Sequence, residues 1–223
     1  MRKSAKSRLL RKSRLPARTE REFETTLVAT VQRAYPAKSW LHSALTIRSS
    51  RRRFAARLNS GVRAHMEDLR PLMIAAAQYD CPALLAEWSW LVPSSDTPLF
   101  ISAFGDWVFG NPDGSLWVLS VLEGNYTQVA RNSHEYNNLN KSSEWLEQTF
   151  IAGWLPIAAG HGLVPSKDQC LGWRVHPLIG GKFESSNLQL FYMTVYQSLM
   201  GQLHRQIQQI PAPAAKKQWF KLW

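Results

Sequence analysis

The chain has 223 residues, of which 45% are apolar, and its formal net charge is +11. This length suits one globular domain or two small ones, and the apolar fraction can fill a core. No run of about 18 apolar residues occurs, so we expect no membrane-spanning helix. The two cysteines, Cys81 and Cys170, are too few for a disulfide framework, and we therefore expect a reducing, cytoplasmic setting.

The positive charge is confined to one end of the chain. Residues 1–65 hold 17 Lys or Arg against 3 acids, a net charge of +14, whereas residues 66–223 hold 10 against 13, a net charge of −3. A stretch so rich in one charge has little means to bury a core. We therefore expect a disordered basic extension over residues 1–65, a folded domain over 66–211 and a tail over 212–223.

Four interpretations of the basic extension stay open. It is a basic arm that binds the phosphates of nucleic acid, an organelle transit peptide, an arm that lies on a membrane surface, or a segment ahead of the true translation start at Met66. The last interpretation has support in the sequence after Met66, which places acids in the first turn of an apolar-periodic helix.

Two short helices are expected at the start of the folded domain. Apolar residues at helical spacing predict a helix over residues 67–79. Pro82 suits the first position of a second helix that reaches Trp88. The composition of residues 93–98 predicts a loop.

The hydrophobic period then changes to that of strands. Strands are predicted over 99–104, 107–110, 115–121 and 124–130. The sequence NPDG at 111–114 predicts a turn, because Pro112 presets one dihedral angle and Gly114 tolerates a positive φ. Trp107 and Trp117 stand five residues on either side of Pro112, so we expect them to pair across the sheet.

The second half of the domain returns to helices and then adds a further strand pair. A helix begins near Glu144, is kinked or ended at Pro156 and stops at Gly160 and Gly162. Later elements are predicted as strands over 170–178 and 187–194, a turn over 179–181 and a closing helix over 195–209. This layout is an α+β fold, with helices packed on a mostly antiparallel sheet.

Residues that could carry chemistry form no enzyme pattern in the sequence. No two histidines have metal-ligand spacing, and neither a nucleophile elbow nor a glycine-rich phosphate loop occurs. Asp106, Asp113 and Glu123 could be drawn as an acid–base or metal group, but turn and strand-end roles are favoured. We interpret His161 as a helix-end contact and Cys170 as a small buried residue. We therefore expect no catalytic, metal or cofactor-binding residue.

The sequence GQLHRQI at 201–207 lies in the closing helix. Helical spacing places Gln202, Arg205 and Gln206 on one side of it. This polar side is either an ordinary solvated face or a surface that another protein contacts. Gly201 within a helix costs about 1 kcal/mol relative to alanine, which predicts close packing at that point.

Several of these motifs together resemble one protein family. The segments GDWVFGNPDGSLWVL at 105–119, LEGNYTQVA at 122–130, QCLGWRVHPLIGGKFESSNLQL at 169–190 and SLMGQLHRQI at 198–207 resemble the C-terminal domain of type VI secretion DNase-immunity proteins, formerly a domain of unknown function. The resemblance covers roughly residues 90–210, and a kinship with SUKH-type immunity folds is a further possibility. Two departures are His176 before its proline and the sequence of residues 1–65, which does not resemble the GAD-like domain that often precedes this one.

The resemblance implies a bacterial, cytosolic, non-catalytic immunity protein. Such a protein binds a cognate toxin, here a nuclease effector, and blocks it by docking on or near its active site. The mildly acidic domain agrees with a basic nuclease partner, and exposed tryptophans suit interface anchors. Six residues are candidates for the toxin interface: Trp107, Asp113, Trp117, Gln202, His204 and Arg205.

Two other functions stay open. The first is nucleic-acid binding through residues 1–65, whereas the net negative charge of residues 66–223 argues against such binding there. The second is an enzyme, whose activity would depend on Asp106 or His204.

Overall fold

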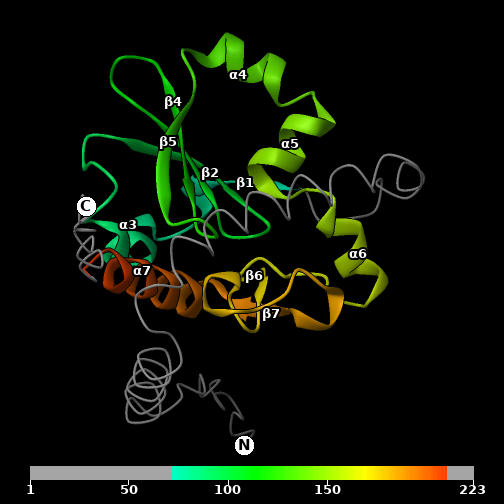
Figure 1. The fold of residues 1–223 in the computed structure, drawn as a ribbon. Helices are drawn as coiled ribbons and strands as arrows, with labels where there is room; N and C mark the ends of the chain where they lie inside the picture. Colours follow the sequence, from blue (N-terminus) through cyan, green and yellow to red (C-terminus); the bar gives the residue numbers. More distant parts are fainter. Residues whose placement is uncertain (1–71, 210–223) are drawn as a thin grey trace, which may run out of the picture. The chain divides into compact units, whose positions relative to one another are not determined.

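The computed structural model describes residues 72–209, which form a mixed α+β domain (Figure 1). The described residues all belong to one compact unit. The predicted α+β class, with helices packed on an antiparallel sheet, is confirmed. The predicted basic extension, the boundary at residue 65 and the tail over 212–223 lie outside the described residues.

A five-stranded antiparallel sheet forms the first part of the domain. Its strands are β1 (Met73–Ala75), β2 (Thr97–Ser102), β3 (Trp107–Gly110), β4 (Leu116–Ser120) and β5 (Asn125–Ala130). They lie side by side in chain order, and every neighbouring pair is antiparallel. Short turns connect β2, β3, β4 and β5 in succession, which is why the turn residues between these strands are distinct in the sequence, whereas residues 76–96 separate β1 from β2.

The prediction of a helix over residues 67–79 is wrong for residues 72–79, the part of this range that the structure describes. Met73–Ala75 is a strand at the edge of the sheet, antiparallel to β2, and the short 3-10 helix η1 (Ala76–Gln78) follows it. A short apolar run fits a strand as well as a helix, and the open edge of β2 selects the strand. The next prediction is confirmed, since Pro82 stands in the first turn of α3 (Cys81–Leu85) and η2 (Ala86–Trp88) continues to the predicted end.

The pairing expected between Trp107 and Trp117 is wrong, because the β3–β4 turn is longer than the sequence suggests. Trp117 stands opposite Phe109, two residues further along β3 than expected. The turn spans five residues, and the Asn111 N–H donates to the Ser115 carbonyl at 2.9 Å. Its centre therefore lies one residue after Pro112, which shifts every cross-strand pair of the hairpin.

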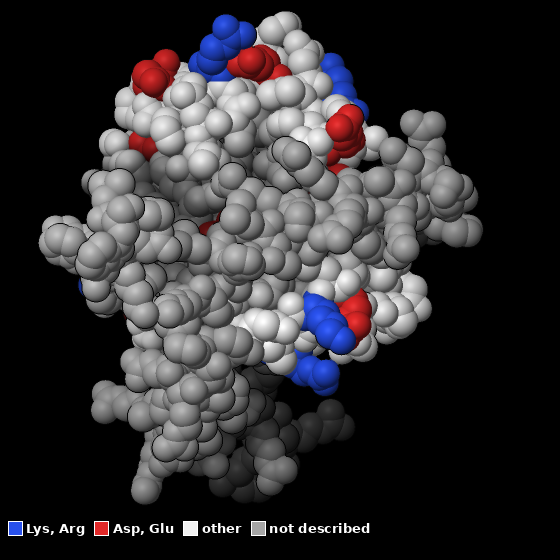
Figure 2. Space-filling view, viewed as in Figure 1, with Lys and Arg blue, Asp and Glu red and all other residues white. Residues whose placement is uncertain are grey.

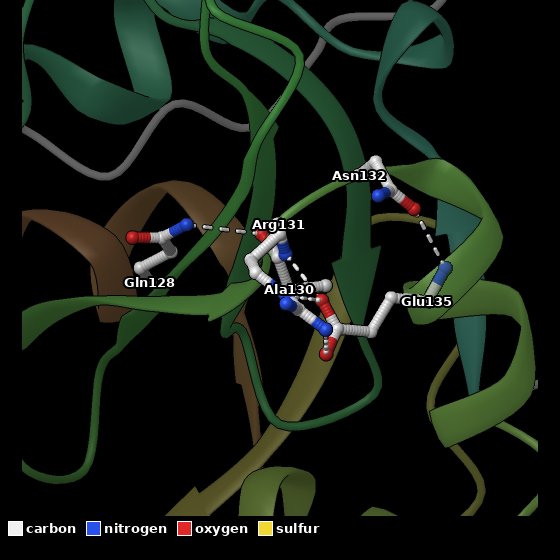
Figure 3. Close-up of polar contacts among 5 residues, drawn as sticks. All are labelled: Gln128, Ala130, Arg131, Asn132 and Glu135. Atoms are coloured by element: carbon white, nitrogen blue, oxygen red, sulfur yellow. Dashed lines mark hydrogen bonds and ion pairs between the residues drawn. The ribbon is translucent and has the colours of Figure 1, made fainter.

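One face of the sheet is covered by two helices, α4 (Ser133–Leu139) and α5 (Ser143–Phe150). Their apolar side chains and those of the sheet form a buried cluster of Val108, Leu116, Val118, Ala130, Tyr136 and Phe150. The sequence did not predict α4, which carries few apolar residues. End contacts hold it instead (Figure 3): the Asn132 side chain accepts from the Glu135 N–H at 2.9 Å, and Arg131 pairs with Glu135 at 3.1 Å.

The helix break predicted at Pro156 occurs several residues earlier. Helix α5 ends at Phe150, Ile151 takes a left-handed conformation with φ 49°, and α6 (Trp154–Gly160) begins after it. The Glu147 carboxylate accepts from the Gly153 N–H at 2.6 Å and so holds this break. Pro156 falls in the first turn of α6, where a proline is tolerated because its missing N–H has no helical partner there. The predicted stop at Gly160 is confirmed.

A second, two-stranded sheet pairs β6 (Gln169–Trp173) with β7 (Leu188–Tyr192). Strand β6 is shorter than predicted, because the 3-10 helices η3 (Pro177–Ile179) and η4 (Ser185–Asn187) fill the connection. With α6 and two turns of the first sheet, this pair forms a second buried cluster: Ala103, Phe104, Leu122, Ile151, Trp154, Leu155, Ala158, Leu171, Trp173, Leu178 and Leu188.

The closing helix α7 (Met193–Gln209) runs beside α3 and η2 (Figure 1). Gly201 faces η2 so closely that an added Cβ would lie 2.8 Å from the Glu87 carbonyl oxygen. The close packing expected at Gly201 is therefore confirmed. Within residues 72–209, no helix is both long and apolar enough to cross a membrane.

Candidate functional site

The structure places four of the six interface candidates in two separate groups. Asp113 and Trp117 lie at the β3–β4 turn, whereas Gln202 and Arg205 lie on α7. The β4–β5 turn contacts α7, since His204 Nε2 donates to the Val121 carbonyl at 2.9 Å. The two groups are thus at opposite ends of β4, so the structure brings Asp113 together with Trp117 and not with the helix residues.

Two of the six candidates are not presented at the surface. Trp107 is 0% exposed and His204 is 3% exposed. Trp107 lies on the same sheet face as Phe109, with ring centroids 6.3 Å apart, and the His204 ring packs against Trp88 and His176 at 5.8 and 5.5 Å. Burial of these side chains serves the core, so we remove both from the candidate interface.

The exposed turn residue Asp113 begins a chain of hydrogen bonds that ends at an indole. Asp113 Oδ1 accepts from the Ser115 N–H at 2.8 Å and from the Ser115 hydroxyl at 2.6 Å. The same hydroxyl accepts from Trp117 Nε1 at 2.9 Å. The hydrogen bonds from the Ser115 side chain and backbone lower the pKa of Asp113, so the carboxylate stays charged. These bonds fix the Trp117 ring relative to a negative charge.

A second set of contacts holds the Trp117 ring from the neighbouring strand. Trp117 stacks on Tyr126, with ring centroids 5.2 Å apart and planes 23° apart. The Tyr126 hydroxyl donates to Asp96 Oδ2 at 2.6 Å, and Asn111 Nδ2 donates to Asp96 Oδ1 at 3.0 Å. Burial, followed by the hydrogen bond to Asp96, raises the pKa of Tyr126, which keeps the phenol in its donating form. We call Asp96, Asn111, Asp113, Trp117 and Tyr126 the hairpin patch.

Sequence reasoning missed Asp96 and Tyr126. Asp96 lies in the loop before β2, 30 residues from the tyrosine that it holds. Tyr126 meets Trp117 because β5 pairs with β4 in a register that places Gln128 opposite Trp117, so that Tyr126, two residues before Gln128, lies diagonally across from Trp117 on the same face. The sequence predicted both strands but not the register between them.

The stretch of sequence that contains the hairpin patch carries charge of one sign. From Leu72 to Ala130 the sequence has no Lys or Arg, but six acids: Asp80, Glu87, Asp96, Asp106, Asp113 and Glu123. The next elements are different, because acidic and basic side chains stand side by side around α4 and α5 (Figure 2). The sheet and α3 are therefore the negative part of the described domain.

The group drawn from Asp106, Asp113 and Glu123 takes the turn and strand-end roles that the sequence favoured. Asp106 is buried, and its Oδ1 accepts from the Val121 N–H at 2.8 Å. Glu123 accepts from Asn125 Nδ2 at 2.8 Å within the β4–β5 turn. In the described residues, no three His, Cys, Asp or Glu side chains are grouped so that they could hold a metal ion.

Comparison of the chain with protein-family models and with curated proteins finds no match. The resemblance to DNase-immunity domains therefore stays a prediction that rests on the motifs themselves. In the structure, glycines of these motifs lie at contacts between elements: Gly124 faces His204, Gly172 faces Tyr196 and Gly201 faces Glu87. These glycines thus hold elements of the fold together, whereas the hairpin patch combines the exposed carboxylate of Asp113 with two half-buried aromatic rings and has no such packing role.

Proposed function

We propose that this protein is a non-catalytic immunity protein that binds and neutralises a cognate toxin in the bacterial cytoplasm. The toxin is a nuclease effector of a type VI secretion system. The observation that carries the proposal is the hairpin patch, in which an indole and a phenol are fixed by hydrogen bonds and stacking. Aromatic anchors that are already rigid lose little entropy on binding, and tryptophan and tyrosine are enriched among residues that dominate interface energy.

Electrostatics supports a nuclease as the partner. A nuclease must carry positive charge where it binds the phosphates of its substrate. The stretch from Leu72 to Ala130 carries only negative charge, so it complements such a surface and speeds encounter with it. Docking there would block access of DNA to the toxin.

The test begins with the full chain, tagged and recovered from its own bacterium, with mass spectrometry of whatever binds it in equal amount. The recovered partner is then assayed for nuclease activity with and without the chain. We expect equimolar chain to suppress the activity. A partner without nuclease activity, or a nuclease that the chain leaves active, contradicts the proposal.

A matched pair of variants connects inhibition to the patch. Trp117→Ala removes the half-buried indole, and we expect a loss of binding of at least about 2 kcal/mol, the size typical of a dominant interface residue. Tyr192→Ala is the control, because Tyr192 is a 64% exposed aromatic residue on β7, outside the hairpin patch. If both variants lost the same binding free energy, inhibition would not depend on the hairpin patch.

A second candidate function, nucleic-acid binding, is favoured by the net charge of +14 in residues 1–65. Its measurement is the affinity of the full chain for duplex DNA over a range of salt. Replacing Arg51, Arg52 and Arg53 by serine should reduce the slope of log affinity against log salt by up to about 3 if all three contact phosphates. If neither salt nor these substitutions changed the affinity for DNA, this function would be excluded.

A further inference from the structure

The exposed carboxylate of the hairpin patch has capacity for one more partner. Both hydrogen bonds to the Asp113 carboxylate arrive at Oδ1, from the backbone and side chain of Ser115. Its Oδ2 has no partner among the described residues, and its turn is exposed. Arg131 follows Ala130, which pairs with Leu116 at the same end of the sheet, but its guanidinium is already paired with Glu135 at 3.1 Å. The lowered pKa of Asp113 means that this oxygen is charged at neutral pH.

The indole beside this carboxylate is a ready surface for a cation. Trp117 is half-buried, and one side of its ring is stacked on Tyr126. Trp117 Nε1 is joined to Asp113 Oδ1 through a single hydroxyl, by contacts of 2.9 and 2.6 Å. Indole is the best of the aromatic rings for binding a cation over its face. A cation near Trp117 would therefore meet both the ring and the free carboxylate oxygen.

We propose that the hairpin patch binds an arginine side chain presented by the partner protein. The planar guanidinium stacks on Trp117 while its N–H groups donate to Asp113 Oδ2. Lysine fits this arrangement less well, because an ammonium group is a compact point charge that does not stack. The occupant is a basic protein surface, since the six acids and the absence of Lys or Arg from Leu72 to Ala130 attract one. This inference rests on the proposed function only where it identifies the partner as the toxin.

The test uses the full chain labelled with ¹⁵N and a short blocked peptide, Gly-Arg-Gly-Arg-Gly. The readout is the indole N–H resonance of Trp117, assigned by its loss in Trp117→Phe. Two peptides of equal length are controls, one with lysine and one with citrulline, which keeps the shape of arginine without its charge. We expect saturable shifts of the Trp117 indole with the arginine peptide, affinity at least about threefold weaker with lysine, and no shift with citrulline.

Variants of two exposed aspartates locate the site. Asp113→Asn should weaken binding of the arginine peptide at least about fivefold, because it removes the paired charge. Asp168→Asn, in the exposed turn before β6, is the matched control and should leave the affinity unchanged. Equal effects of the two substitutions, equal response to citrulline or lysine, or no shift of the Trp117 indole would each overturn the proposal.

Two other occupants have their own signatures in the same experiment. If the Trp117 indole shifts on dilution without peptide, a second copy of the chain occupies the patch. If it shifts with added salt at constant oligomeric state, the basic residues 1–65 of the same chain occupy it. Either result overturns a partner protein as the occupant. The peptide titration needs no toxin, so its failure leaves the proposed function standing when the recovered nuclease is still inhibited.

Discussion

Gly124 shows how one residue of the β4–β5 turn controls the packing of a distant helix. Its φ is +63°, a left-handed conformation that glycine adopts easily. A Cβ at this position would overlap the imidazole ring of His204, which is buried in α7. Glycine is thus needed here twice, once for the backbone and once for space. Gly114 in the β3–β4 turn shares the backbone requirement alone, because nothing lies within 4 Å of its added Cβ.

These two glycines make a matched pair of substitutions. We expect Gly114→Ala to lower the free energy of unfolding by about 1 kcal/mol, the cost of a left-handed alanine. Gly124→Ala should lower it by about 3 kcal/mol, because displacement of the His204 ring adds to the same backbone cost. Urea unfolding of both variants checks this difference. Equal losses would mean that His204 moves aside without cost.

The buried histidine pair makes stability depend on pH. Burial lowers the pKa of His204 to about 4, and burial together with the charge of His204 lowers the pKa of His176 well below its usual value. An unfolded histidine has a pKa near about 6.5, so the unfolded chain takes up protons first as the pH falls. The contribution of this pair to the free energy of unfolding is therefore fully present above about pH 6.5. It is lost as the pH falls from there toward pH 4.

We expect His204 alone to account for a loss of about 2 kcal/mol in the free energy of unfolding between about pH 7.5 and pH 5. The measurement is urea unfolding at a series of pH values. His204→Gln should flatten the pH dependence, although it lowers stability overall. His161→Gln changes an exposed histidine at the end of α6 and should leave the pH dependence as it is. A wild-type curve that is flat over this range would refute the linkage.

At the scale of elements, α7 contains a glycine that lowers its helix propensity but permits close packing. Gly201 is less favourable in a helix than alanine, yet an added Cβ would lie 2.7 Å from the Glu87 Cβ and 2.8 Å from the Glu87 oxygen. The contact brings α7 against η2 and lets the His204 ring reach Trp88. The glycine therefore sets the distance between two elements.

Substitution of Gly201 should reverse the usual effect of alanine in helices. We expect Gly201→Ala to destabilise the protein by about 2 kcal/mol, because the backbone of η2 must move to admit the methyl group. Gly160→Ala is the control, since Gly160 also lies in a helix and nothing lies within 4 Å of its added Cβ. The control should be neutral or stabilising by up to about 1 kcal/mol. Thermal unfolding of both variants distinguishes the two effects, and stabilisation by Gly201→Ala would contradict the packing argument.

Prediction of elements from the sequence succeeded where local chemistry is distinctive. The strands around the NPDG turn, the first turn of α3 with Pro82 and the end of α6 at Gly160 each have residues suited to that position. Prediction failed for β1 and α4. Met73–Ala75 becomes a strand because β2 offers an open edge, and α4 depends on its end contacts and on Tyr136 packing against the sheet. Neither cause is visible within a short window of sequence.

At the scale of the whole molecule, backbone hydrogen bonds join the two sheets. The Leu171 N–H of β6 donates to the Ala103 carbonyl at 2.8 Å, and the Ala103 N–H donates to the Leu72 carbonyl at 2.7 Å. Gln197 of α7 donates to the Gly105 carbonyl at 2.7 Å, so the closing helix is joined to the same turn. The turn after β2 is therefore shared by both sheets and by α7.

These connections predict that the two sheets unfold together. Amide hydrogen exchange in the native state should give the most protected amides of β4 and β6 the same free energy of opening, within about 1 kcal/mol. Exchange measured by NMR at several low urea concentrations checks this. If β6 opens well below the global free energy while β4 does not, the two-stranded sheet is an independent unit.

The sequence by itself determined the α+β class, most of the strands, the closing helix and the close packing at Gly201, because each depends on local periodicity or on a residue with one dominant preference. The tertiary structure decided the register of the β3–β4 hairpin, the burial of Trp107 and His204, and the assembly of Asp96 and Tyr126 around Trp117. Those outcomes depend on pairs of residues that are distant along the chain, and a shift of one position in the β3–β4 turn changes every cross-strand pair of that hairpin.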